Sequence, residues 1–141
     1  LKDIIKMFGV DTSTNEQLEK WARNKLKIYI QVLMADEINE EIGKLSVINY
    51  QESDEKGSHW VAFYNELQSF YFDPFGLEPL PNIPKCMYNS VQVQPYKTRL
   101  CGQLCLYFLF KMNMCECDNK EAKFDDIIEE MLDVLWPESL L

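Results

Sequence analysis

Apolar residues near the start of the chain recur with the period of a helix. Ile4, Ile5 and Phe8 share one helical face, and Gly9 ends this first pattern. A capping-box pattern follows, in which Thr14 and a glutamine three residues later can satisfy the first N–H groups of a second helix. We expect both helices to be packing elements, and the second has three residues on its apolar face: Leu18, Trp21 and Ala22.

The next part of the chain alternates between strand-forming runs and one acidic segment. Residues 28–33 and 45–49 are rich in β-branched and aliphatic side chains, which predicts two strands. Between them, residues 35–42 predict a short acidic helix that ends at Gly43.

Two aromatic runs, residues 60–64 and 70–72, predict a β-hairpin because a short polar segment separates them. The stretch 73–76 and three later prolines end the second strand and begin an irregular loop, since proline cannot donate to a strand ladder. We expect a further brief strand around residues 90–94.

Two helices are predicted for the last third of the chain. Residues 101–112 are apolar nearly all round, which indicates a buried helix. Residues at about 124–136 have apolar side chains at helical spacing, which predicts an amphipathic helix with an acidic outer face. We therefore expect an α+β fold: a small mixed or antiparallel sheet packed on a central buried helix and flanked by further helices.

Composition and charge fit one compact domain over residues 1–141. Hydrophobic residues make up 47% of the chain, which excludes disorder throughout. The net charge of -9 does not support a nucleic-acid partner, because gripping phosphates requires a basic surface. Residues 116–141 contain nine acidic residues and two lysines, so most of the negative charge lies there. The net charge therefore does not exclude a weak basic patch on residues 1–115.

Five cysteines, at positions 86, 101, 105, 115 and 117, cannot all pair within one molecule, so we expect a reducing intracellular compartment such as cytoplasm, nucleus or virion. They lack the C-x2-C pairs of most zinc sites, so we expect no metal and no other cofactor, with structural zinc as an alternative. The longest apolar run, residues 104–110, is too short to span a bilayer, and we expect no membrane partner. Because the sequence opens on Leu1, we expect a processed product or an excised domain.

The single histidine and one of the cysteines suggest thiol chemistry. His59 is the only side chain here whose ordinary pKa suits proton transfer near neutral pH. Cys101 begins the predicted buried helix, whose N-terminus would stabilise a thiolate, and Gly102 would let a substrate chain approach closely. The alternative is an ordinary histidine at a strand edge and a cysteine that fills the core. We expect small buried hydrophobic groups at the other four cysteines: Cys86, Cys105, Cys115 and Cys117.

Two further side chains could complete such a site. Asp73 ends the second aromatic strand, so its carboxylate could orient the imidazole of His59, or it could merely cap the turn at Pro74. Gln94 lies on the approach to Cys101 and could donate to an oxyanion. Gln92 would face the same side of an extended segment, so spacing alone does not choose between the two glutamines.

Taken together, these blocks resemble the adenovirus maturation protease family, the adenains. The resemblance lies in G-S-H-W-V-A-F at 57–63, Y-F-D-P-F-G at 71–76, Gln94, and L-C-G-Q-L-C at 100–105, and it covers roughly residues 25–112. The chain is more similar still to the adenain-like proteases of Polinton (Maverick) elements and virophages, whose segment before the sheet resembles residues 32–38. The wider clan includes the ubiquitin-like deconjugating proteases, which share the order His, Asp, Gln, Cys.

The resemblance implies an adenain-like fold and a papain-like active site reached by a different chain order. It assigns His59 as base, Asp73 as its orienting acid and Cys101 as nucleophile. It also selects Gln94 over Gln92 as oxyanion donor, since the family's glutamine lies seven residues before the cysteine. It implies that Trp60 and Gly102 contact substrate, and that Trp60 walls the site and keeps solvent from the imidazole.

The function implied is that of a cysteine endopeptidase which cleaves capsid or other structural precursors after small-residue motifs such as glycine pairs. The partners expected are a polypeptide substrate and an optional activating peptide, and we expect a monomer. One alternative is a protease specific for ubiquitin-like modifiers. Another is a protein-binding module that keeps the fold without turnover.

Overall fold

The computed structural model describes residues 1–9, 14–50, 59–95 and 98–136 and has the α+β fold that the sequence predicts. Its α-helices are α1 (Lys2–Phe8), α2 (Asn15–Trp21), α3 (Cys101–Met114) and α4 (Lys120–Leu135). Its strands are β1 (Gln31–Met34), β2 (Leu45–Asn49), β3 (Trp60–Asn65), β4 (Ser69–Phe72) and β5 (Met87–Tyr88). The capping box of α2 and the hairpin of β3 and β4 are both present, which confirms those two predictions.

The five strands form one mixed sheet in sequence order, from β1 at one edge to β5 at the other. The two outer pairs are parallel and the two inner pairs are antiparallel. The central strand β3 is buried from Trp60 to Tyr64. Such a strand is a rigid support for a residue placed directly at its end, and the histidine stands immediately before it.

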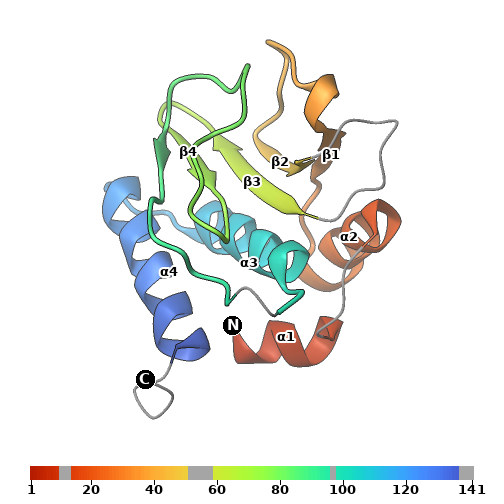
Figure 1. Ribbon diagram of the computed structural model, residues 1–141, viewed down its shortest axis with the longest axis vertical. Helices are drawn as coiled ribbons and strands as arrows, with labels where there is room; N and C mark the ends of the chain where they lie inside the picture. The colour runs from red at the N-terminus through yellow and green to blue at the C-terminus, as the bar shows by residue number, and fades with distance from the viewer. Residues whose placement is uncertain (10–13, 51–58, 96–97, 137–141) are drawn as a thin grey trace.

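The two faces of the sheet pack against different material because side chains alternate along a strand. Trp60, Ala62 and Tyr64 of β3 belong to the larger apolar cluster, which contains α3. Val61 and Phe63 belong to a smaller cluster on the other face, formed with residues of two loops, among them Ile38, Ile42 and Leu80. Helices therefore cover one face of the sheet, and loops cover the other (Figure 1).

Helix α3 is the centre of the structure. Every residue from Cys101 to Leu109 is buried, which confirms the prediction of a helix that is apolar nearly all round. α1, α2 and α4 contact it, and Figure 1 shows them arranged around α3 below the sheet. The Phe108 ring stacks on Phe72 of β4 at 5.1 Å and meets Phe124 of α4 edge-on at 5.8 Å, so α3 is held between the sheet and the last helix.

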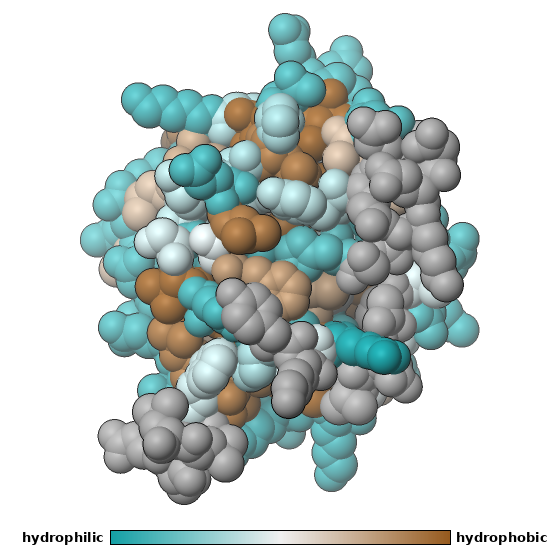
Figure 2. All heavy atoms as spheres, in the orientation of Figure 1, coloured by the Kyte–Doolittle hydropathy of each residue, from teal (hydrophilic) through white to brown (hydrophobic). Residues whose placement is uncertain are grey.

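The face of the molecule shown in Figure 2 is mostly polar. In the same orientation, Figure 2 shows hydrophilic residues around the rim of the molecule, with smaller apolar areas between them. None of the helices in the described part of the chain has the length and apolarity needed to cross a membrane.

The acidic helix predicted for residues 35–42 is wrong. Only a short 3-10 turn, Ala35–Glu37, forms there, and Ile38 already has an extended backbone. The Asn39 side chain then accepts a hydrogen bond from the N–H of Glu41 at 2.7 Å. Such a local bond offers the backbone an alternative to the helix.

Two strand predictions need correction as well. The first strand begins at Gln31 instead of residue 28. No strand forms at 90–94, and the brief strand is β5, at Met87–Tyr88. The N–H groups of Val93 and Gln94 both donate to the carbonyl of Pro74 at 2.8 Å, so this segment packs on a turn instead of joining a ladder.

Candidate active site

The side chains of His59, which is partly buried, and Asp73, which is fully buried, form a pair at the start of β3. Asp73 follows β4, the antiparallel neighbour of β3, so the hairpin brings its carboxylate to the histidine. His59 Nε2 lies 2.9 Å from Asp73 Oδ1, and the two side chains are 14% and 0% exposed. The orienting geometry proposed for Asp73 is therefore present.

The same carboxylate also caps the turn that follows it, so the two interpretations of Asp73 are not exclusive. Its Oδ1 accepts from the Phe75 N–H at 2.8 Å as well as facing the histidine. The Gly76 N–H donates to the Asp73 carbonyl at 2.8 Å and closes a β-turn over residues 73–76. Asp at the first turn position and Pro at the second are the residues such turns favour.

Burial, Asp73 and Cys101 act together on the pKa of His59. Burial disfavours the charged ring and lowers this pKa, but hydrogen bonding and charge from Asp73 and Cys101 outweigh it and raise the pKa from 6.5 to about 9. An imidazole with this pKa is protonated at neutral pH. An imidazolium beside a cysteine sulfur stabilises the thiolate, which is the nucleophilic form.

Two aromatic rings hold the imidazole in place. Phe75 stacks on it with ring centroids 4.8 Å apart, and Tyr50 meets it edge-on at 5.5 Å. The Tyr50 N–H also donates to the His59 carbonyl at 2.8 Å. Neither residue has a role predicted from the sequence. Phe75 lies within the 71–76 block and could have been suspected, but Tyr50 has no sequence signal.

Cys101 is the first residue of α3 and lies close enough to His59 to raise its pKa. Asp73 occupies Nε2 of the ring, and Nδ1 is buried without an aligned hydrogen bond among the described residues. Hydrogen bonding and charge from Cys101 contribute to the raised pKa of His59, so the sulfur lies beside the ring. Cys101 is only 4% exposed, and Gly102 behind it is buried as well.

Trp60 lies in the same buried cluster as Cys101 and Leu100 and is 3% exposed. It follows His59 directly and faces the helix side of the sheet. This position beside the site is compatible with the wall expected from the resemblance. Its near-complete burial leaves little of its surface for a substrate to contact.

Gln94 is 1% exposed and lies on the segment that packs on the turn after Asp73. Its Nε2 donates to the carbonyl of Thr98 at 2.8 Å, which orients the amide, because a carbonyl can only accept. An amide nitrogen has two hydrogens, and this bond uses one of them. Gln92 instead donates to the Gln94 carbonyl at 2.9 Å, so its amide braces the segment.

The turn at residues 73–76 explains why this block needs its glycine. Gly76 has a φ of 72°, and a Cβ there would lie 2.7 Å from the carbonyl carbon of Val91. A side chain would be strained by the backbone angle and would push the 91–94 segment away. Gly76 thus lets the turn that carries Asp73 lie against the segment that carries Gln94.

Several buried polar atoms near the site have no hydrogen-bond partner among the described residues. They include Asp73 Oδ2, His59 Nδ1 and Gln94 Oε1. Buried polar atoms are nearly always satisfied in folded proteins, and exceptions concentrate where chemistry takes place. Three of the four residues proposed from the sequence thus carry such an atom.

The remaining cysteines differ from one another. Cys105 is fully buried, as expected, and burial raises its pKa well above the ordinary value. Cys86 is half-buried, and burial raises its pKa to about 11. The expectation of two further buried hydrophobic groups is wrong, because Cys115 and Cys117 form a disulfide and Cys117 is exposed.

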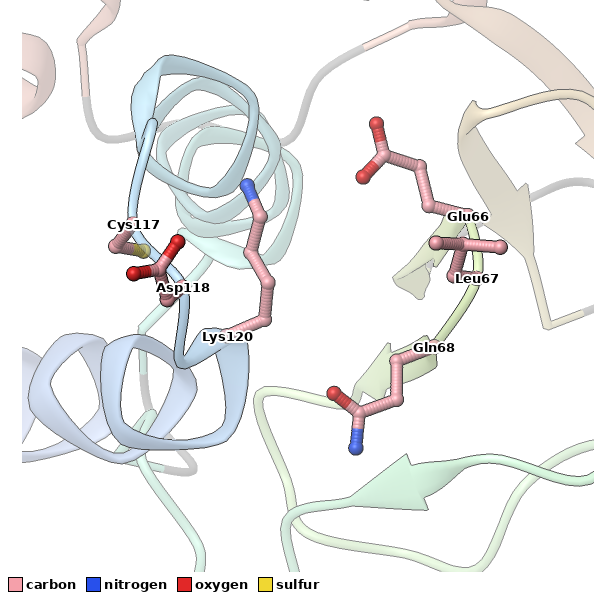
Figure 3. Close-up of a pocket in the computed structure, with 6 residues that line it drawn as sticks. All are labelled: Glu66, Leu67, Gln68, Cys117, Asp118 and Lys120. Carbon is pink, nitrogen blue, oxygen red and sulfur yellow. The ribbon is translucent and has the colours of Figure 1, made fainter.

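A pocket lies at the other end of β3 and α3, away from His59 and Cys101. Residues 66–68 of the hairpin turn line one side of it, and Cys117, Asp118 and Lys120 line the other (Figure 3). Across the part of the chain that the structure describes, no group of three or more His, Cys, Asp or Glu side chains is placed to hold a metal ion.

The chain matches no model of a known protein family, and no curated protein matches it.

Proposed function

We propose that this protein is an adenain-like cysteine endopeptidase whose nucleophile is Cys101. The observation that carries the proposal is the part-buried His59–Asp73 pair, 2.9 Å apart, beside a cysteine at the first position of a central helix. Aspartate, imidazole and thiol in contact form the set that thiol proteases use. The mixed sheet on a buried helix is compatible with the adenain and ubiquitin-like protease fold, which we propose as the finer description.

The reaction begins with attack of the Cys101 thiolate on a peptide carbonyl carbon, which forms a C–S bond and places negative charge on the carbonyl oxygen. The C–N bond then breaks, and the His59 imidazolium gives its proton to the leaving amine. Water attacks the resulting thioester, with neutral His59 now taking a proton from it. The C–S bond breaks, a carboxylic acid leaves, and the imidazolium and thiolate return.

The carbonyl oxygen needs donors while it carries charge. The first N–H groups of an α-helix have no acceptor within the helix, and the earliest helical bond here is Leu104 N–H to Leu100 carbonyl. We assign the Cys101 N–H and the second Nε2 hydrogen of Gln94 to this role.

Access to the sulfur is the strictest condition on this proposal, because Cys101 is only 4% exposed. A peptide carbonyl must reach it beside the imidazole. Gly102 adds no side chain that would stand in the way of a substrate backbone. A cysteine that cannot be modified in the folded protein would contradict the function outright.

The substrate proposed is a capsid or other structural precursor cleaved after small residues, and it rests on the resemblance to the adenains. We also propose a reducing compartment, because the nucleophile must not be oxidised, and Cys101 takes no part in a disulfide. The Cys115–Cys117 disulfide counts against a strictly reducing one. The net charge of -9 gives no support for a nucleic-acid activator.

The test uses a peptide probe that ends in a glycine pair and an electrophile, together with a panel of capsid precursors and ubiquitin-like modifier fusions. We expect one covalent adduct, on Cys101, and cleavage of precursors. Cys101→Ser and His59→Ala should abolish both. Cys86→Ser is the matched control, because it removes another free cysteine and should leave both unchanged.

The other outcomes discriminate between the alternatives. Rapid cleavage of modifier fusions alone would replace the capsid substrate with a modifier and keep the mechanism. A probe that labels no cysteine, or labels Cys86 as fast as Cys101, would favour a binding module without turnover.

A further inference from the structure

The side chain of Asn89 makes three hydrogen bonds beside the site. Asn89 Oδ1 accepts from the N–H of Asp73 at 2.9 Å. Its Nδ2 donates to the carbonyl of Asp73 at 2.6 Å and to the carbonyl of Val91 at 3.2 Å. Asn89 is 5% exposed, and both hydrogens of its amide nitrogen are used. The side chain is therefore committed to these three backbone groups.

These bonds continue the sheet where its ladder ends. The β4–β5 pairing stops with Tyr71 opposite Tyr88, and Asn89 is the next residue along the chain. A side-chain amide has the same donor and acceptor as a peptide group. Asn89 can thus pair with Asp73 as a further strand residue would, although the backbone itself has left the sheet.

The two bonds to Asp73 hold the peptide groups on both sides of its α-carbon. The N–H belongs to the peptide before Asp73, and the carbonyl belongs to the peptide after it. Anchoring both planes fixes φ and ψ of Asp73, and with them the direction of its Cβ. The direction of the Cβ decides where the carboxylate meets His59.

We propose that Asn89 is a positioning residue, which aims the Asp73 carboxylate at His59 by fixing the backbone on both sides of Asp73. This inference rests on the proposed function. The bond from Asn89 to the Val91 carbonyl also ties Asp73 to the segment that carries Gln94. One amide thereby aligns the orienting acid with the oxyanion donor.

The experiment follows the ring of His59 by NMR as pH changes, which is unambiguous because the chain has one histidine. In the unmodified protein we expect titration near a pKa of about 9. In Asn89→Ala the pKa should fall toward the ordinary 6.5, because the carboxylate is no longer held against the ring. Turnover of a cleaved peptide should fall up to about 100-fold, mostly in kcat, since misplaced catalytic groups cost rate.

Asn65→Ala is the matched control. The Asn65 side chain also donates to a backbone carbonyl, that of Ile42 at 3.1 Å, and accepts from Ser69 at 2.9 Å, but it lies at the far end of β3. We expect this variant to lose stability without any change in the His59 titration. If Asn89→Ala loses stability and still titrates as the unmodified protein does, Asn89 is merely structural and the proposal is overturned.

Two further arms keep the outcome decisive. If Asn89→Ala does not fold, Asn89→Ser keeps a hydroxyl that can pair once and should give an intermediate pKa. In the unmodified protein, the Asp73 amide should exchange its hydrogen as slowly as the amides of β4, and exchange typical of an open loop would overturn the proposal. A lowered His59 pKa in Asn89→Ala, with no probe adduct on Cys101 in the unmodified protein, would support the positioning role and reject the protease.

Discussion

Strand β3 and helix α3 support polar side chains at both of their ends, but the polar groups at the two ends differ in burial and in hydrogen bonding. At the starting end, Asp73 is buried and His59 is partly buried, and each has a buried polar atom without a hydrogen-bond partner among the described residues. At the far end, Lys44 and Glu66 form an exposed ion pair at 2.7 Å. Gln68 donates there to Glu121 at 2.5 Å. Among the described residues at this end, the buried Tyr64 hydroxyl, beside Glu66, lacks an aligned hydrogen bond.

The open pocket and the proposed reactive site therefore lie at different ends of β3 and α3. The far end has the open pocket of Figure 3, yet two of its charged groups are already engaged. Glu66 pairs with Lys44, and Lys120 donates to the carbonyls of Met112 and Cys115 at 2.9 and 2.7 Å. The starting end is more enclosed and holds the polar groups that are still incomplete. Chemistry is expected where polar groups are buried and incompletely satisfied, not where space is largest.

The largest expected difference between the two ends is the loss of a sulfur. Cys101→Ser should lower the cleavage rate by at least about 1000-fold, because removing a nucleophile removes the covalent route. The double variant Cys115→Ser with Cys117→Ser removes the disulfide of the far end and should leave the rate within about twofold, since that site is distant. Initial rates on one cleaved peptide measure both. If both variants lost the same fraction of the cleavage rate, the two ends would not differ in function as proposed.

The next effect concerns the charge of the imidazole. Asp73→Asn should lower the cleavage rate by about 100-fold or more, because the ring loses the partner that orients and charges it. Unmodified protein should stay active up to a pH near 9, where the imidazolium that protonates the leaving amine is lost. In Asp73→Asn this upper limit should move toward 6.5.

A pH–rate profile measures that shift, and Glu66→Gln is its control at the far end. Glu66 belongs to an ion pair and has no contact with the histidine, so its profile should match that of the unmodified protein. An unchanged upper limit in Asp73→Asn would show that this carboxylate does not set the charge of the ring.

A smaller loss is expected from the aromatic stack. Phe75→Ala should lower kcat about tenfold, because a ring that is no longer packed samples unproductive orientations. Leu67→Ala is the comparison, since Leu67 at the far end is fully exposed and packs on nothing that orients a reactive group. Steady-state kinetics of both variants decide, and equal kcat values would remove Phe75 from the site.

The two ends should also respond to pH in opposite directions. The pKa of His59 is raised on folding, so its contribution to stability is complete below about 6.5 and is lost as pH rises to about 9. The Lys44 ammonium lowers the pKa of Glu66, so that contribution is present above 4.5 and is lost as pH falls below it. We expect up to about 3 kcal/mol for the buried pair and under about 1 kcal/mol for the exposed one.

Urea unfolding over this pH range checks the signs. His59→Gln should flatten the decline of the free energy of unfolding above pH 6.5, and Glu66→Gln should flatten the decline below 4.5. Stability that rises between pH 6.5 and 9 would contradict the sign given for the buried pair.

Local patterns predicted most of the fold. The apolar run of α3 and the aromatic runs of β3 and β4 have enough hydrophobic residues to decide their own structure. The failures lie where a single side-chain bond overrides propensity. Asn39 breaks the helix expected for 35–42, and the Pro74 carbonyl draws 93–94 out of a ladder.

Only some residues of the candidate site could be predicted from the sequence. His59 and Cys101 stand out by uniqueness and by placement, and Asp73 follows from hairpin pairing. Asn89 and Tyr50 had no such signal, because their roles depend on contacts across loops, between residues whose proximity no period or spacing encodes. The fold must be known before such residues can be found.

The measurement that tests the central claim most directly is the rate at which iodoacetamide alkylates each free cysteine, followed by mass spectrometry near neutral pH. We predict that Cys101 reacts first, ahead of Cys86 and Cys105, and that His59→Ala slows it at least about tenfold while leaving Cys86 unchanged. Cys101 that reacts no faster than Cys86, or that is indifferent to His59→Ala, would contradict an activated thiol at the start of α3.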